Sequence, residues 1–339
     1  MNDHFTKYDL DLEYYQQNLK DRLPSTIIDA HRHYNLPEHV KNITPETILG
    51  DWALECGLLM SYEDSVHYDH TLFPDQKIYP VGLPWPLRDA DTVGNNNYIA
   101  ELISNHDIRG LYTLRPEYDV EMIERDYLAG KFTGFKPYPY MASGIKGAEV
   151  SIFDFMTRPQ FALANKLKAS VLMHLPRAER LPDPDNVSEL RTIMNDYPDV
   201  KMVIAHFGRC FNDKYFSRAL EAFGDDIHGL WFDTSAVINP KVYALAFENL
   251  DFHKILFGTD FPIMLWHGKR EWPGEKYVNL CREDFTWNKH QYPEQEDNYT
   301  FIVYEQLNSM LNAIDGDPDI LKATFVENAA EVYGYQQLI

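Results

Sequence analysis

The sequence has few of the features that mark membrane, secreted or disulfide-rich proteins. It contains no run of about 18 apolar residues, so we expect no membrane span. Its three cysteines, Cys56, Cys210 and Cys281, are scattered, which argues against a disulfide framework and fits a reducing compartment. The stretch 1–16 is polar and acidic and lacks the apolar region of a signal peptide, so we expect a cytoplasmic protein.

Positive charge is also scarce in this chain. Its 31 Lys and Arg residues face 52 Asp and Glu residues, and the formal net charge is -21 at pH 7. Such an excess argues against nucleic acid and anionic membranes as partners, and a small molecule is the expected partner instead. A local pocket can still carry the opposite charge. The 45% hydrophobic content is sufficient for a globular core.

Short apolar runs alternate with helical patterns along most of the 339 residues. We expect strands at 25–34, 77–84, 108–115, 132–138, 170–175, 200–207, 229–235 and 254–260. We expect helices at 45–57, 92–106, 119–130, 151–168, 186–197, 213–223, 240–250 and within 301–333. Eight such units predict an α/β protein with one domain over residues 1–339, a (β/α)8 TIM barrel that ends in a C-terminal helix, and the family resemblance described below implies that this barrel is distorted.

Two segments do not fit this alternation and look irregular, 61–76 and 264–300. Long loops of this kind are uncommon unless they are functional, so we expect both at the mouth of the barrel. The second segment follows the eighth strand and is rich in Trp, Pro and charged residues. It could be a lid that covers a planar substrate or part of a subunit interface, and the second reading is compatible with a homodimer.

The most informative segment of the chain is 27–33, with the sequence IIDAHRH. The apolar run predicts a buried strand, and side chains two residues apart on a strand point to the same face. His31 and His33 would therefore project side by side at the end of this strand. Neutral imidazole is a common ligand of catalytic metals, so the pair indicates a metal site.

Other predicted strands also end in groups that can bind a metal. His174 ends the fifth strand, His206 the sixth and Asp260 the eighth. In a TIM barrel the C-terminal ends of the strands share one rim, where catalytic residues lie. Several imidazoles and a carboxylate with one position left for water form a catalytic site for zinc or a similar ion.

Five segments of the chain resemble the amidohydrolase superfamily, in its branch of metal-dependent hydrolases and decarboxylases. They are 28–33 (IDAHRH), 203–208 (VIAHFG), 230–235 (LWFDTS), 255–262 (ILFGTDFP) and 325–334 (FVENAAEVYG). The resemblance implies metal ligands at His31, His33, His174 and Asp260, with His206 beside the catalytic water. Arg209 departs from the pattern, because many relatives carry a second glycine there, and this leaves the substrate open.

The number and identity of the metal ions remain open at this stage. Zinc is the first choice, and manganese, iron or cobalt would also suit His and Asp ligands. Binuclear relatives use a carboxylated lysine at the end of the fourth strand to bridge two ions. Lys136 stands at that position, and His174 and His206 could then hold the second ion. We expect one ion, as in most members of this branch.

Four cationic residues fall near predicted strand ends: Arg115, Lys136, Arg177 and Arg209. Arginine suits bidentate binding of carboxylates, so these residues are candidates for binding an anionic substrate. The alternative is that they pair with nearby acidic residues such as Asp183 or Asp213.

Taken together, these features predict a metal-dependent hydrolase of a small carboxylated or cyclic substrate such as a lactone, ester or amide. Asp260 would ligate the metal and take a proton from water, and His206 would orient the nucleophile or polarise the carbonyl. The same residues would suit a nonoxidative decarboxylase of an aromatic or unsaturated acid. A third alternative is a barrel that binds metal without catalysis.

Overall fold

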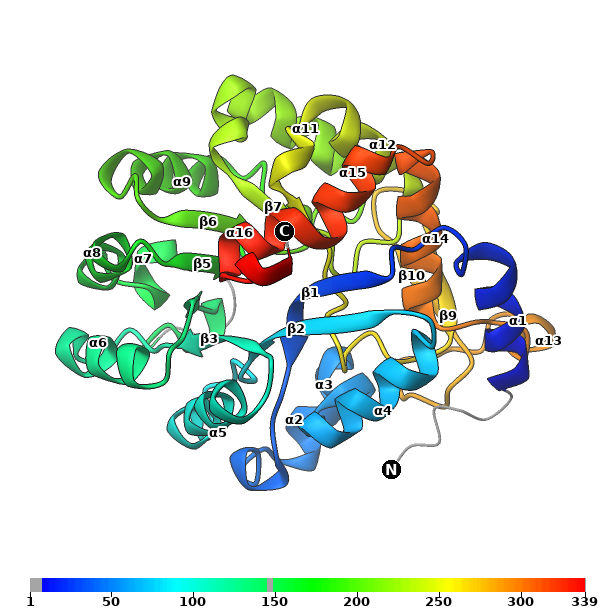
Figure 1. Ribbon diagram of the computed structural model, residues 1–339, viewed down its shortest axis with the longest axis horizontal. Helices are drawn as coiled ribbons and strands as arrows, with labels where there is room; N and C mark the ends of the chain where they lie inside the picture. The colour runs from blue at the N-terminus through cyan, green and yellow to red at the C-terminus, as the bar shows by residue number, and fades with distance from the viewer. Residues whose placement is uncertain (1–7, 145–148, 339) are drawn as a thin grey trace.

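Eight parallel strands follow one another in chain order around a nearly closed barrel (Figure 1). The computed structural model describes residues 8–144 and 149–338. The strands are β1 Thr26–His33, β2 Lys77–Leu83, β3 Arg109–Thr113, β4 Gly134–Lys136, β5 Ser170–Met173, β6 Lys201–Ile204, β7 Trp231–Asp233 and β8 Ile255–Leu256. The chain after β8 completes the ring against β1, because the N–H groups of Ala30 and Asp260 donate to the carbonyls of Phe257 and His31. The predicted TIM barrel is confirmed.

Helices surround the barrel and cover its outer face (Figure 1). The longer ones are α1 Tyr8–Asn18, α4 Tyr62–Leu72, α5 Thr92–Asn105, α6 Val120–Ala129, α8 Arg158–Leu167, α9 Pro184–Asp196, α11 Asp213–Phe223, α12 Pro240–Asn249 and α14 Ile302–Ile314. The shorter ones are α2 Pro45–Leu49, α3 Trp52–Gly57, α7 Ile152–Phe155, α10 His206–Arg209, α13 Pro293–Glu296, α15 Pro318–Lys322 and α16 Asn328–Tyr333. Single turns are η1 Pro37–His39, η2 Pro139–Met141, η3 Gly224–Gly229, η4 Phe252–Lys254, η5 Ala323–Glu327 and η6 Gln336–Leu338.

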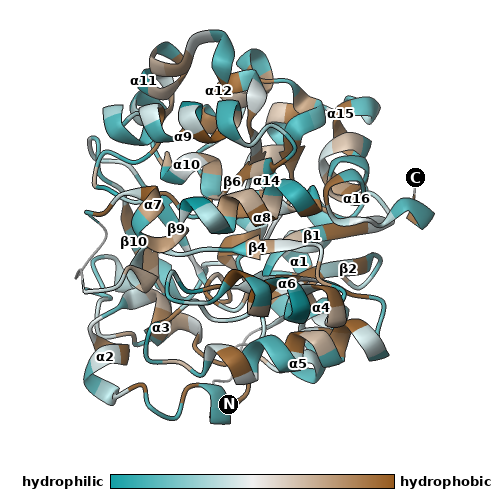
Figure 2. Ribbon diagram, turned by 90° about the vertical axis from the view of Figure 1, so that its left-hand side faces the viewer, coloured by the Kyte–Doolittle hydropathy of each residue, from teal (hydrophilic) through white to brown (hydrophobic). Residues whose placement is uncertain are grey.

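Hydrophobic burial and local capping explain why these segments adopt these elements. Val171, Val203 and Phe135 on the strands are fully buried, as expected for parallel strands that helices cover. The helices alternate between hydrophilic and hydrophobic residues (Figure 2), as amphipathic helices packed on a sheet do. Asp119 caps α6 by accepting hydrogen bonds from two backbone N–H groups of its first turn. Of the helices in the described residues, none is both long and apolar enough to cross a bilayer.

Three predictions about helices differ from the structure, and the segment 264–300, also expected to be irregular, contains a hairpin and the short helix α13. The segment 61–76 contains helix α4, which begins at a capping box formed by Ser61 and Asp64. The expected helix 45–57 divides into α2 and α3, because Asp51 caps a new helix by accepting from the N–H of Ala53. The expected helix 151–168 divides in the same way into α7 and α8, with Thr157 at the start of the second. These cap residues were visible in the sequence, but the apolar period alone did not reveal the breaks.

The segment after β8 forms an antiparallel hairpin of β9 Gly268–Glu271 and β10 Val278–Cys281. His267 anchors its base and is fully buried, with Nε2 3.0 Å from an oxygen of Asp11 and Nδ1 2.6 Å from an oxygen of Glu283. Burial acts to lower the pKa of His267, but the hydrogen bonds to the two carboxylates outweigh burial and raise this pKa. This contact ties the base of the hairpin to helix α1, which carries Asp11.

Candidate metal centre

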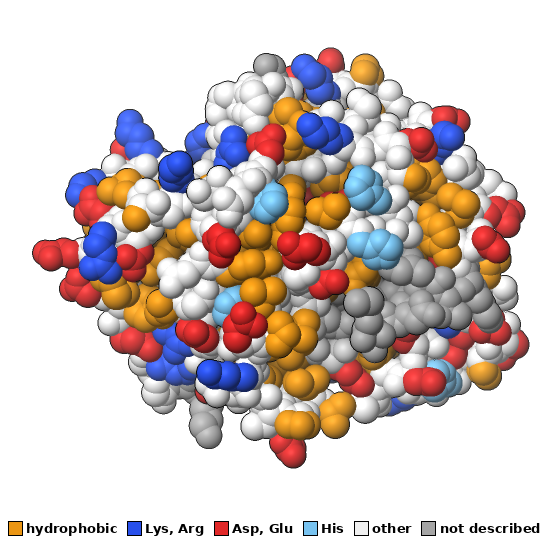
Figure 3. Space-filling view, turned by 60° about the horizontal axis from the view of Figure 1, so that its bottom comes forward, with side chains coloured by type: hydrophobic (Ala, Val, Ile, Leu, Met, Phe, Trp, Pro, Cys, Tyr) orange, Lys and Arg blue, Asp and Glu red, His pale blue; other side chains and the backbone are white. Residues whose placement is uncertain are grey.

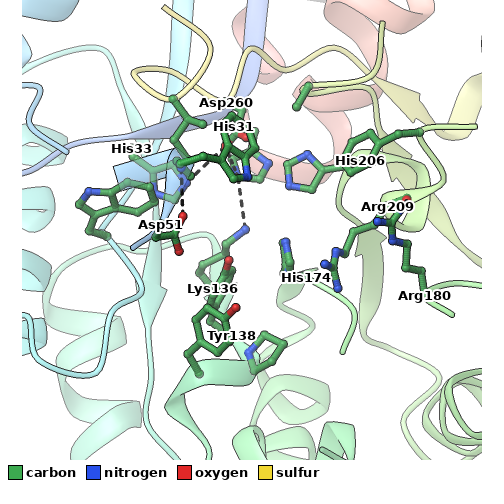
Figure 4. Close-up of a pocket in the computed structure, with 18 of the residues that line it drawn as sticks. His31, His33, Asp51, Lys136, Tyr138, His174, Arg180, His206, Arg209 and Asp260 are labelled. Atoms are coloured by element: carbon green, nitrogen blue, oxygen red, sulfur yellow. Dashed lines mark hydrogen bonds and ion pairs between the residues drawn. The ribbon is translucent and has the colours of Figure 1, made fainter. Parts of the chain in front are cut away.

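A single cavity of about 180 Å³ lies where the C-terminal ends of the strands meet. Residues from five of the eight strand ends line it: His31, His33, Lys136, His174, His206 and Asp260. Figure 4 shows these side chains converging from different strands on the same space. The structure therefore brings together all five residues that the sequence indicated as metal ligands or catalytic groups.

Hydrogen bonds determine which nitrogen of each imidazole carries the proton. His31 Nδ1 lies 2.8 Å from an oxygen of Asp233, and His206 Nδ1 lies 2.9 Å from the carbonyl oxygen of Ser235. His33 Nδ1 lies 3.2 Å from the carbonyl oxygen of Pro84. Because carboxylate and carbonyl oxygens only accept, each Nδ1 donates and each Nε2 retains its lone pair. All three rings thus have the tautomer that a metal-binding imidazole needs.

These lone pairs face a carboxylate. Asp260 Oδ1 is 3.4 Å from Nε2 of His31 and 3.5 Å from Nε2 of His33. One ligand atom each from His31, His206 and Asp260 lie within 4.8 Å of one another. A lone pair set against a carboxylate is repulsive, and a cation bound between them would turn this repulsion into attraction. The donor set of nitrogen and carboxylate oxygen fits a divalent transition metal.

The protonation states agree with this fit. Burial, reinforced by the positive charge of Lys136, lowers the pKa of His31 and of His33 well below the ordinary value. Burial also lowers the pKa of His206 to about 4, despite the opposing effect of Asp260. The imidazoles are therefore neutral near pH 7, as metal ligands must be.

His174 approaches the same centre from β5. Its ring centroid lies 5.5 Å from that of His206, and its Nδ1 is buried with no hydrogen-bond partner among the described residues. A buried nitrogen without a partner is costly, so it marks a position where a ligand would be bound. The three residues whose ligand atoms lie within 4.8 Å of one another are His31, His206 and Asp260, and they do not include His174 or His33. An ion bound by His31 and Asp260 would therefore also lie within reach of His206.

Lys136 at the end of β4 points into this polar centre. Its side chain is 1% exposed, and Nζ is 3.3 Å from Nε2 of His31. Burial lowers the pKa of Lys136 to about 8, although Asp233 and Asp260 act in the opposite direction. Among the described residues no carboxylate forms an ion pair with this ammonium within 4 Å.

Asp233 at the end of β7 is a positioning residue that we did not single out from the sequence. It is fully buried, and its Oδ1 accepts from the backbone N–H groups of His206 and Ser235 at 2.9 and 3.0 Å. Its other oxygen accepts from His31. One carboxylate thus orients the imidazole of His31 and fixes the backbone of His206. Its place at a strand end was a usable signal, but its hydrogen bonds could not be inferred from the sequence.

The backbone at the centre is also unusual. His206, Arg209 and Asp260 have φ values of 57°, 62° and 63°, in the left-handed region. This conformation costs a non-glycine residue of the order of 1 kcal/mol or more, and it is found mainly where function requires it. The three residues are therefore held by surrounding contacts in orientations that a relaxed chain would avoid.

The cationic candidates separate into two groups. Lys136 and Arg209 line the cavity, whereas Arg115 and Arg177 do not. Arg115 donates to Thr92 and to the carbonyls of Arg88 and Ala90. The guanidinium of Arg177 is occupied by Glu189 and Asn186. A substrate-binding role for Arg115 or Arg177 therefore gains no support from the geometry.

Two cavity arginines were missed by the sequence argument, Arg180 and Arg270. Arg180 belongs to the loop after β5, six residues beyond His174, and Arg270 belongs to strand β9 of the hairpin. A strand-end criterion does not detect either residue, because neither follows a barrel strand directly.

Known proteins resemble this chain over nearly its whole length. A protein family described as Amidohydrolase matches residues 28–335. No curated protein matches the chain.

Among solved structures, a probable 2-pyrone-4,6-dicarboxylic acid hydrolase from Acinetobacter baumannii with citric acid bound is 16% identical, with a TM-score of 0.55. The match covers 91% of this chain and 99% of that one. The 2,6-dihydroxybenzoate decarboxylase from Rhizobium is 14% identical over 92% and 100% of the two chains, with a TM-score of 0.56. A 5-carboxyvanillate decarboxylase from Novosphingobium aromaticivorans, solved with manganese, is 12% identical over 91% and 97%, with a TM-score of 0.57. At these identities the likeness concerns the fold.

Proposed function

This chain belongs to the amidohydrolase family, and from that premise we propose that it is a metal-dependent hydrolase of a small carboxylated or cyclic substrate, namely a lactone, ester or amide. The observation that carries the proposal is the set of imidazole lone pairs that face Asp260 inside one enclosed cavity. We propose that His31, His33, His174 and Asp260 hold one divalent ion, with zinc as the first choice. A relative contains manganese, so manganese is the first alternative.

The metal, when bound, acts as a Lewis acid that polarises a carbonyl and makes a neighbouring water acidic near neutral pH. His206 Nε2 has a free lone pair, because its Nδ1 donates to Ser235. It can therefore accept a hydrogen bond from the attacking water and orient it. Asp233 holds the ring of His31 through Nδ1 and so keeps its tautomer, and it fixes the backbone of His206, whose ring is held by the carbonyl of Ser235.

Asp260 moves the proton. Its carboxylate takes a proton from water while the water oxygen forms a bond to the carbonyl carbon of the substrate. When the bond from that carbon to the leaving oxygen or nitrogen breaks, Asp260 returns the proton to the leaving group. One water is consumed, and no oxidant or reductant is needed. Lys136 and Arg209 are proposed to bind the substrate's negative charge.

Nonoxidative decarboxylation is the second candidate. Two of the similar structures described above are decarboxylases of aromatic acids, and Trp85, Tyr138 and Phe211 supply aromatic surface to this cavity. In that reaction the carbon–carboxylate bond breaks, carbon dioxide leaves, and Asp260 in its acid form protonates the carbon.

The two reactions leave different products. Metal-loaded protein should be incubated in H₂¹⁸O with carboxylated lactones and esters and with hydroxybenzoates. For a hydrolase we expect one ¹⁸O atom in the product acid and no release of carbon dioxide. Carbon dioxide release without ¹⁸O incorporation would overturn hydrolysis in favour of decarboxylation. Turnover of neither class would favour the non-catalytic barrel.

We expect about one metal ion per chain in the purified protein, measured by plasma mass spectrometry. His31→Ala should lose the ion, because His31 contributes an inward Nε2. His253→Ala is a matched control, since the side chain of His253 is 64% exposed and lies outside the cavity. About two ions per chain, with a carboxylated Lys136 detected by mass, would contradict the mononuclear site. Equal metal content in both variants would contradict the proposed ligand set.

A further inference from the structure

Three arginines in the cavity lack the acidic partners that buried arginines normally have. Arg209 donates to the carbonyl of Leu175 at 3.0 Å, and Arg180 donates to the carbonyl of Arg209 at 2.9 Å. Arg270 donates to the carbonyl of Ala236 and to the amide oxygen of Asn279, both at 2.8 Å. Within the described part of the chain, no carboxylate forms an ion pair with any of these three guanidinium groups.

Arg32, a buried arginine that does not line the cavity, provides a comparison, because it is paired with carboxylates. Its side chain is fully buried, and carboxylates of Asp29 and Asp69 lie 2.8 and 2.7 Å from it. The protein has many acidic groups, and Figure 3 shows them scattered over one face among basic and hydrophobic side chains. The lack of an acidic partner at the three cavity arginines is therefore a local feature and not a shortage of carboxylates.

The charge of Arg180 is close enough to oppose the charges of Arg209 and Arg270. Burial lowers the pKa of both Arg209 and Arg270, and repulsion from Arg180 acts in the same direction, although neighbouring tyrosines and, for Arg270, Asp260 act to raise it. Only 5% of Arg270 is exposed, and the Nε of Arg180 is buried without a hydrogen-bond partner. Cations that are buried or half-buried without an acidic partner are unfavourable, and an anion that enters the pocket would relieve the repulsion.

Aromatic rings hold the guanidinium groups together. The Cζ atoms of Arg180 and Arg270 lie 5.5 and 5.2 Å from the centroid of the Phe211 ring. The Cζ atom of Arg270 also lies 4.2 Å from the centroid of the Tyr277 ring. Figure 4 places Arg180 and Arg209 beyond His174 and His206, on the side of the cavity away from His33. Arg180 and Arg209 thus lie beside the proposed metal centre and do not coincide with it.

We propose that Arg180, Arg209 and Arg270 form a subsite for a second carboxylate of the substrate, and that Arg270 is its specificity-determining residue. The substrate class is then a small dicarboxylate or tricarboxylate, with one acid group remote from the reacting carbon. Guanidinium groups suit this task, because their paired donors match the two oxygens of a carboxylate. The chemistry at the metal rests on the proposed function, but anion binding at the subsite can be measured without turnover.

Arg270 determines specificity because of its position in the fold. It projects from the hairpin that follows β8, outside the eight barrel strands. Trp272 Nε1 donates to the carbonyl of Phe211 at 2.6 Å, and Asn212 donates to the carbonyl of Gly274 at 3.0 Å. These contacts fix the hairpin against the loop that carries Phe211, so Arg270 is held at the cavity wall before a ligand arrives.

The test uses matched ligands that differ by one carboxylate, with metal-loaded full-length protein and titration calorimetry. Glutarate is compared with butyrate, and isophthalate with benzoate. We expect the diacid of each pair to bind about 10- to 100-fold more tightly, the range for hydrogen bonds to charged groups. Arg270→Gln should remove most of this preference. Arg125→Gln should retain it, because Arg125 is 70% exposed and does not line the cavity.

A second variant protects the test against misfolding of the hairpin, since Arg270 also binds the carbonyl of Ala236. Arg180→Gln removes a charge without altering the hairpin strands, and it should also weaken the diacid preference. Circular dichroism and the melting temperature check that each variant is folded. Equal binding of diacid and monoacid by the wild type, or an unchanged preference in both variants, would overturn the subsite.

The experiments can support or overturn the subsite independently of the proposed function. A diacid preference that is lost in Arg270→Gln, in a protein that turns over no substrate, would support the subsite while the proposed function fails. Hydrolysis of neutral and dicarboxylated lactones with the same kcat/KM would overturn the subsite while the proposed function stands.

Discussion

Asp260→Asn is expected to lower kcat/KM by a factor of at least about 10³, because the amide can neither take the proton from water nor balance the charge of a metal. Asp260 Oδ1 lies 3.4 and 3.5 Å from Nε2 of His31 and His33, so it is placed for both tasks. The measurement is steady-state turnover of the first substrate found in the product assay, with metal content determined on the same samples.

The control for this variant is Asp284→Asn, because the side chain of Asp284 is 99% exposed. It should keep the activity and metal content of the wild type. Asp260→Asn should retain the circular dichroism spectrum of the barrel, since its side chain supports no strand pairing. Near-wild-type turnover by folded Asp260→Asn would contradict both the metal centre and the mechanism.

Arg32→Met is expected to reduce the free energy of unfolding by about 3–5 kcal/mol, the usual cost of removing one partner from a buried ion pair. The guanidinium is fully buried between Asp29 and Asp69, and it also donates to Ser65 at 2.8 Å. Methionine replaces the aliphatic stem of arginine but removes the guanidinium, which leaves both carboxylates without their positive partner. Urea denaturation followed by circular dichroism measures the change.

Two comparisons separate this effect from a simple loss of charge. Lys20→Met removes the cation from a surface pair with Asp75, whose side chains are 41% and 45% exposed at a distance of 3.8 Å, and should cost under about 1 kcal/mol. The double variant Arg32→Met with Asp69→Leu should recover part of the lost stability. A cost for Arg32→Met no larger than that for Lys20→Met would show that the buried pair is energetically unimportant.

Arg32 lies between His31 and His33 in the sequence, and this arrangement links stability to the site. Alternation along β1 directs the two histidines into the cavity and Arg32 away from it. The register of β1 shifts between Asp29 and Arg32, so Asp29 can form an ion pair with Arg32 three residues on, and Asp69 on α4 forms a second one. The sequence indicated the two histidines, but the partner on α4 could not be recognised, because the segment 61–76 was expected to be irregular.

The sequence could predict the position of side chains that depends on the end of a single strand. It could not predict contacts that form only where distant segments of the chain meet. His31, His174, His206 and Asp260 each lie within four residues of the C-terminal end of a barrel strand, and the barrel topology then places all of them on one rim. Arg115 also follows a strand, but its guanidinium turns to backbone carbonyls. Strand position alone does not decide where a long side chain ends.

The sequence by itself determined the alternation of strands and helices, and with it the barrel and the rim on which the proposed metal ligands lie. These features follow from the spacing of apolar residues and from the direction of side chains along one strand, which are local properties. Only the tertiary structure decided the tautomers set by Asp233 and Ser235, and the group of Arg180, Arg209 and Arg270. Those depend on hydrogen bonds and burial between segments far apart in the chain, and the folded packing alone brings them within a few ångströms.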